Sequence, residues 1–160
     1  MKINFLNSKE KKNFIEVLKK NYEFKGKIEH YLFEKEEKYF IVNNEIGKIL
    51  NAKDIKLNIN SYGLYIGELR HENFRFSVEG AQIYGKECNK NIVEIDKEQT
   101  REWFNGNNVV LIKGQKAEDK TYVLIKYGDL FIGCGRIDER IIMNFLPKVR
   151  RIATNDFEMQ

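Results

Sequence analysis

The sequence has little of what builds disulfide scaffolds, metal centres or membrane spans. Its 160 residues contain only two cysteines, two histidines, one proline and one tryptophan. Cys88 and Cys134 lie far apart with no CxxC spacing, so neither a disulfide framework nor a zinc site is expected. The N-terminus lacks a long apolar run, which predicts no signal peptide, no membrane span and a cytoplasmic location. Scarce proline and the lack of low-complexity segments argue against a disordered linker.

Catalytic signatures are missing as well. His30 and His71 belong to no recognisable motif, and His71 reads as a turn or surface residue. No GxxxxGK[ST] loop is present, and no GxGxxG leads into a helix. Cys134 is set in an apolar strand and is interpreted as a buried small side chain rather than a nucleophile. The prediction is a protein that is not an enzyme and needs no cofactor or metal.

What is present indicates a folded domain with a mixed surface. Hydrophobic residues make up 42% of the chain and aromatic residues 12%, while charged residues reach 32% with a net charge of +4. Residues 1–90 hold 17 basic and 13 acidic side chains, and residues 91–160 hold 11 of each. This balance permits a nucleic-acid partner without requiring one.

The first 90 residues predict a compact antiparallel α+β unit. Ser8 is expected to cap a helix from Lys9 to about Tyr22, whose lysines form either a basic face for RNA or an ordinary solvated surface. Asn43-Asn44 is expected to cap a short helix through Leu50, and a further helix starts near Glu79. A polar connection then ends at a domain boundary near residue 90. Alternating or apolar runs predict the strands His30–Phe33, Lys38–Val42, 56–60, Leu64–Leu69 and Asn73–Val78.

The second half predicts a small closed barrel. Asp96 and Gln99 form a capping-box pattern for a helix from Lys97 to Asn105, and Gly106 takes the left-handed position after it. Of the adjacent Trp103 and Phe104, Phe104 is expected in the core. The strands that follow are Val109–Ile112, buried on both faces, a hairpin of Tyr122–Lys126 and Leu130–Cys134 around Tyr127-Gly128-Asp129, and a closing strand, Lys148–Ile152.

Two stretches resemble the PUA domain, a small RNA-binding pseudo-barrel. They are the helix-to-strand joint Phe104-Asn105-Gly106-Asn107-Asn108-Val109 and the later Gly133-Cys134-Gly135. PUA domains occur in pseudouridine synthases, archaeosine transglycosylases and ribosome-assembly factors. The resemblance covers roughly Asn91 to Ala153 and implies RNA binding.

The first half carries a second resemblance. Gly63–Leu69 and Asn73–Ser77 look like the pre-PUA domain of the Nip-seven-like large-subunit ribosome biogenesis factors of archaea and eukaryotes. The resulting expectation is an α+β chain with a pre-PUA domain at 1–90 and a PUA pseudo-β-barrel at 91–160. Similar domain pairs end some Nol/Nop/Sun-type RNA cytosine methyltransferases. Because no methyltransferase pattern is seen in this sequence, an orphan targeting module for such an enzyme is the alternative.

The resemblance implies an RNA site, and basic residues near the end of the chain suit it. Arginine and lysine contact phosphates, and arginine also stacks on bases. Gly106 would let an RNA backbone approach, or serve only as a helix C-cap; the basic cluster would bind RNA, or form a solvated strand end. The expected function is a non-enzymatic RNA-binding factor in rRNA processing and ribosome assembly, or else a protein-interaction adaptor, with assembly or RNA-modification proteins as further partners. The candidate residues are Lys148, Arg150, Arg151, Arg136, Arg140 and Gly106.

Overall fold

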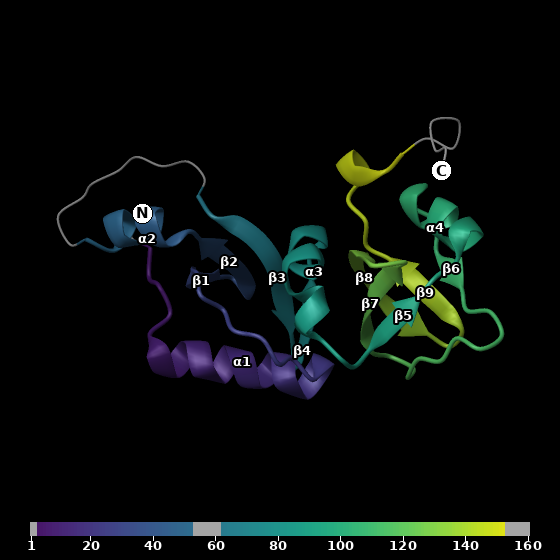
Figure 1. Cartoon of the computed structure of the whole chain (residues 1–160), viewed down its shortest axis with the longest axis horizontal. Coiled ribbons are helices and arrows are strands. Elements are labelled where there is room, and N and C mark those ends of the chain that lie inside the picture. The colour runs from purple at the N-terminus through teal and green to yellow at the C-terminus, as the bar shows by residue number, and fades with distance from the viewer. Residues whose placement is uncertain (1–2, 53–61, 153–160) are drawn as a thin grey trace.

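The residues that the structure describes form two sheets, four α-helices and two 3-10 helices. The structure is a computed structural model, and it describes residues 3–52 and 62–152. Figure 1 shows the two sheets next to one another, with α3 between them, α1 along the first sheet and α4 over the second. The helices are α1 (Ser8–Tyr22), α2 (Asn44–Asn51), α3 (Val78–Tyr84) and α4 (Lys97–Phe104), and the 3-10 helices are η1 (Gly85–Glu87) and η2 (Lys148–Arg150).

The sheets confirm an α+β fold. Sheet A has the order β1-β2-β3-β4 and is wholly antiparallel; its strands are β1 (Tyr31–Lys35), β2 (Lys38–Val42), β3 (Leu64–Arg70) and β4 (Asn73–Phe76). Sheet B has the order β5-β7-β8-β9-β6, with β5 and β7 parallel, and curls in a way consistent with a PUA pseudo-barrel. Its strands are β5 (Ile92–Glu94), β6 (Val109–Val110), β7 (Tyr122–Tyr127), β8 (Leu130–Asp138) and β9 (Ile141–Asn144).

Helix α1 begins one residue earlier than expected. Asn7 caps it: the Asn7 side chain accepts a hydrogen bond from the backbone N–H of Glu10, and the Glu10 carboxylate accepts one from the N–H of Asn7. The prediction that Ser8 caps the helix was therefore wrong, since an upstream asparagine with Glu three residues later completes a capping box. The apolar face is confirmed, because Phe14, Leu18 and Tyr22 are buried.

Sheet A follows the predicted strands with shifted ends: the strand expected over His30–Phe33 is β1, Tyr31–Lys35. The strand expected over Asn73–Val78 ends at Phe76, because Ser77 accepts a hydrogen bond from Gly80 N–H and starts α3 at Val78. Phe74 and Phe76 are buried on one face. The strand expected at 56–60 lies outside the described residues.

One hydrophobic cluster joins the two sheets. The hydroxyl of Tyr22 on α1 donates to the carbonyl of Phe74 at 2.6 Å and lies 3.8 Å from the sulfur of Cys134 on β8. Helix α3 and η1 pack on β8 so closely that a Cβ on Gly85 would stand 2.5 Å from the Phe131 ring. The halves are thus fixed to each other by a shared core rather than by a linker. Its buried members include Phe14, Leu18, Tyr22, Phe74, Phe76, Tyr84, Leu124, Phe131 and Cys134.

Sheet B confirms the predicted β7–β8 hairpin and corrects the strand expected over Val109–Ile112. The two-residue turn Gly128-Asp129 joins β7 to β8, and β8 runs on to Asp138. The strand expected to be buried on both faces is a two-residue edge strand, β6, in which Val109 is 2% exposed and Val110 is 61% exposed. It pairs only with β9 among the described strands, so one of its sides faces no other strand of the sheet.

Candidate nucleic-acid interface

The candidate surface begins at the C-terminal end of α4. Asp96 and Gln99 form the predicted capping box, and the helix ends where Gly106 takes a φ of +85°. The N–H of Gly106 donates to the carbonyl of Trp103, and the N–H of Asn107 donates to that of Glu102. Glycine adopts this left-handed conformation without steric cost, so the predicted C-cap role is confirmed.

Arg151 lies directly against Gly106. A Cβ at Gly106 would stand 2.4 Å from the Nε of Arg151, a distance that no real side chain tolerates. The Nε donates to the carbonyl of Leu146 at 3.3 Å, and the N–H of Ile152 donates to the carbonyl of Phe104 at 2.9 Å. The glycine therefore does two things: it ends the helix and makes room for a guanidinium at the joint.

Lys148 and Arg150 belong to a 3-10 turn, not to the closing strand that the sequence predicted. Pro147 has no N–H to offer a neighbouring strand, and its carbonyl instead accepts from the N–H of Arg150 at 2.8 Å. The turn projects its side chains outward, with Val149 89% exposed. Arg150 forms an ion pair with Glu79 of α3, whereas Lys148 has no ion-pair partner in the part of the chain that the structure describes.

Arg136 belongs to β8 and Arg140 to the turn between β8 and β9, not to η2. Arg140 follows β8 at the far end of β9, where its Nη2 donates to the carbonyl of Leu111 at 3.1 Å and so tethers a loop. Arg136 is opposite Tyr122 in the β7–β8 register and is half-buried. The structure thus gathers Gly106, Lys148, Arg150 and Arg151 at one place; we call these four residues the joint cluster.

Next to the joint cluster lies a pocket that sequence reasoning missed. The guanidinium of Arg75, on β4, lies 4.5 Å from the ring centre of Phe145, which follows β9. Arg75 also pairs with Glu68, a carboxylate that is only 3% exposed. Trp103 is fully buried and Phe104 only partly, so the expectation that Phe104 would be the core residue was wrong.

The two thiols are inert by their surroundings. Burial raises the pKa of the Cys134 thiol to about 11 and that of the Cys88 thiol to about 12, so both stay protonated near neutral pH. Cys134 is 4% exposed, which confirms its reading as a buried side chain. Over residues 3–52 and 62–152, no group of histidine, cysteine and acidic residues could hold a metal ion.

Comparisons with known proteins identify the second half of the chain. A family model described as the methyltransferase RsmF PUA domain matches residues 90–152. The chain contains a PUA domain. The domain comprises sheet B, α4 and the joint cluster, so Gly106, Lys148, Arg150 and Arg151 all lie inside the matched region.

Proteins similar to the chain are ribosomal RNA small subunit methyltransferases F. The protein of Vibrio parahaemolyticus is 29% identical over 96 residues, which are 58% of this chain and 20% of that protein. That of Vibrio vulnificus is 27% identical over 93 residues, 58% of this chain and 19% of the protein. The chain thus matches about a fifth of the length of these relatives. Within the described residues, no helix is long and apolar enough to cross a membrane.

Proposed function

We propose that this chain binds RNA through the joint cluster of its PUA domain and acts, without catalysing a reaction itself, in rRNA processing and ribosome assembly. The main observation behind the proposal is that the Arg151 side chain packs against Gly106, next to the outward-facing Lys148 and Arg150. Guanidinium and ammonium groups on an exposed turn can reach phosphates. Relatives named for ribosomal RNA methylation support ribosomal RNA as the class of ligand.

The proposal also covers the rest of the chain. Residues 1–90 act as a pre-PUA domain in the manner of the Nip-seven-like factors, holding the PUA domain through the shared core and offering sheet A and α1 to assembly proteins. A cytoplasmic location fits this role.

A salt series of RNA binding tests the site. Fluorescence anisotropy with a short uridine-rich single strand should give a linear fall of log affinity with log salt. Replacing Lys148, Arg150 and Arg151 with alanine should make that slope shallower by about 2, since each lost phosphate contact contributes roughly 0.7 for single strands. An unchanged slope would exclude the joint cluster as the RNA site.

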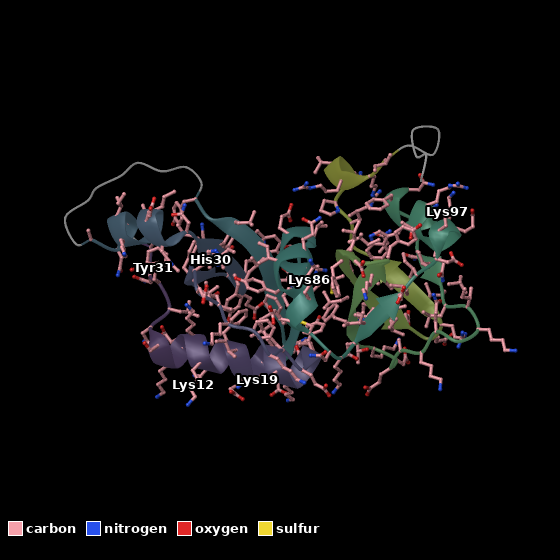
Figure 2. The ribbon with its side chains drawn as sticks, in the orientation of Figure 1. Lys12, Lys19, His30, Tyr31, Lys86 and Lys97 are labelled. Carbon is pink, nitrogen blue, oxygen red and sulfur yellow. The ribbon has the colours of Figure 1, made fainter. Side chains whose placement is uncertain are left out.

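The matched control lies on α1. Lys9, Lys12 and Lys19 are all exposed on α1, and Figure 2 shows Lys12 and Lys19 pointing away from the rest of the chain. Changing these three to alanine removes the same charge, so it separates a localised site from a general effect of net charge. An equal loss in both triple variants would instead favour the basic face of α1 as part of the RNA surface.

A protein adaptor is the second candidate. Residues 91–160 carry no net charge, and Glu79 already occupies Arg150, which weakens the case for a strong electrostatic RNA site. RNA affinity no greater than that of an unrelated protein of similar charge would favour the adaptor.

The third candidate is a targeting module for a methyltransferase. It draws on the relatives, in which the matching segment is about a fifth of a longer enzyme. Incubating the purified chain with RNA and a labelled methyl donor separates a module from an enzyme. No methyl transfer is expected, and transfer by this chain alone would overturn the non-enzymatic role.

A further inference from the structure

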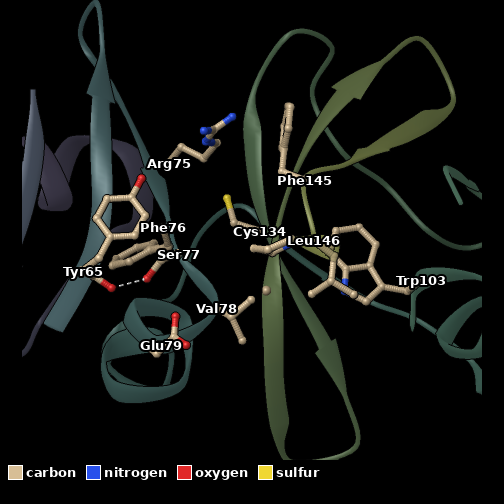
Figure 3. Close-up of a pocket in the computed structure, with 12 residues that line it drawn as sticks. Tyr65, Arg75, Phe76, Ser77, Val78, Glu79, Trp103, Cys134, Phe145 and Leu146 are labelled. Carbon is tan, nitrogen blue, oxygen red and sulfur yellow. Dashed lines mark hydrogen bonds between the residues drawn. The ribbon is translucent and has the colours of Figure 1, made fainter. Parts of the chain in front are cut away.

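A cavity of about 150 Å³ lies between sheet A and sheet B, next to the joint cluster. Figure 3 shows Tyr65 and Ser77 on one side of it, Trp103 and Leu146 on the other, and Cys134 between them. Phe145 and Pro147 are exposed, so the cavity reaches the surface at that rim. The lining residues contributed by sheet A and α3 are Tyr65, Arg75, Phe76, Ser77, Val78 and Glu79.

One residue in the wall of this cavity, Trp103, has an indole N–H without a hydrogen-bond partner among the described residues. Trp103 is 0% exposed, and its indole Nε1 has no hydrogen-bond partner among the described residues. Burying a polar group without a partner is costly, and most such groups in proteins are satisfied. Trp103 lines the cavity but is 0% exposed, so an acceptor placed there satisfies the Nε1–H only once the indole ring shifts toward it.

The rim offers stacking surfaces. The Phe145 ring is 39% exposed, and the Arg75 guanidinium lies 4.5 Å from its centre. Planar cations and aromatic rings are the side chains on which nucleic-acid bases stack. Arg75 is held in place by Glu68, and Glu79 by Arg150, so charged groups line the mouth in fixed positions.

The size of the cavity selects the ligand. An engineered protein cavity of roughly 150 Å³ accommodates benzene, a single six-membered ring. We propose that this cavity takes one pyrimidine base, turned out of the RNA strand that the joint cluster holds by its phosphates. The inference rests on the proposed RNA-binding function and names the base class.

The two parts of the site are continuous along the chain. Pro147, in the cavity lining, directly precedes Lys148 of the joint cluster, and Arg150 reaches back to the lining residue Glu79. A strand whose phosphates lie on the turn therefore passes the rim. A ring carbonyl of the base accepts from Trp103 Nε1–H, with Phe145 and Arg75 covering the ring face.

The test uses the fluorescence of Trp103, the only tryptophan in the sequence. Three short RNAs of equal length are titrated: oligouridylate, oligoadenylate and a ribose-phosphate strand without bases. Anisotropy reports binding and Trp103 emission reports the cavity. The expected result is a change in emission with oligouridylate only, and affinity about tenfold above that of the abasic strand.

Variants at the rim sharpen the result. Phe145→Ala should abolish the emission change and the preference for uridine, while Phe145→Tyr should restore both. Val149→Ala is the control, since Val149 is 89% exposed on the neighbouring turn and outside the lining. It should leave both readouts unchanged.

Each other outcome has a definite meaning. Equal binding of the three strands with unchanged emission would overturn the base pocket and leave RNA binding by the joint cluster standing. Absence of any binding would overturn the RNA function, and a titration with free uridine would then decide the pocket alone. A saturable emission change with uridine would support the pocket, and constant emission would overturn it.

Discussion

At the scale of single residues, a comparison of Gly106 with Gly114 separates backbone strain from the contact of Gly106 with Arg151. Gly106 and Gly114 both have positive φ, at +85° and +93°, but only Gly106 has a neighbour, Arg151, where a Cβ would be. We predict that alanine at either position destabilises the fold by about 1 kcal/mol through backbone strain. Only Gly106→Ala should also displace Arg151 and weaken RNA binding. Urea unfolding and anisotropy on both variants check this, and equal RNA affinities would contradict it.

The buried thiol of Cys134 makes stability depend on alkaline pH. Its pKa is raised by burial to about 11 from an ordinary value of 9.0. Below pH 9 both the folded and the unfolded chain keep the proton, so the full stability is present. Between pH 9 and 11 only the unfolded chain releases it, so the free energy of unfolding should fall by about 1.4 kcal/mol per pH unit from this thiol.

Urea unfolding at pH 8, 9 and 10 measures that slope. Cys134→Ala should have a shallower slope, although its stability at pH 8 will also change because a buried side chain is lost. The comparison is between slopes and not between absolute stabilities. Parallel pH dependence in the two proteins would show that Cys134 ionises as readily in the fold as in the unfolded chain.

At the scale of secondary-structure elements, the sequence predicted features that depend on neighbouring residues but not contacts between distant elements. The capping box of Asp96 and Gln99, the glycine stop and the β7–β8 turn were predicted correctly because each depends on residues a few positions apart. The 3-10 turn after Pro147 was missed because its β-branched and basic residues alternate like a strand. The contact of Arg75 with Phe145 has no local sequence pattern, since Arg75 lies on β4 of sheet A and Phe145 follows β9 of sheet B.

The ion pair between α3 and η2 should weaken RNA binding. Glu79 holds Arg150, and a phosphate would compete with that carboxylate for the guanidinium. Glu79→Gln removes the competing charge, so RNA affinity should rise about two- to fivefold, the range expected for a partly exposed pair. Glu72→Gln is the matched control, because it breaks the exposed pair with Lys20 on α1. Equal gains in the two variants would point to net charge alone.

At the scale of the whole molecule, we expect the two sheets to fold as one unit because they share a hydrophobic cluster. The cluster that buries Phe14, Tyr22 and Phe74 from the first half also buries Leu124 and Phe131 from the second. Separating the halves would expose these side chains to water. The sequence could not show this, because its pattern fixes which face of an element is apolar but not which element covers it.

Phe131→Ala tests the shared core. Phe131 is 8% exposed and packs against Gly85, so its truncation should cost about 3–5 kcal/mol. Leu130→Ala is the control: Leu130 is 65% exposed, and its loss should cost less than about 0.5 kcal/mol. Because the core is common, Trp103 fluorescence in the second half and amide hydrogen exchange in β2 and β3 should report the same loss. A loss confined to Trp103 would mean that sheet A is stable without its partner, and the two halves would then be independent domains.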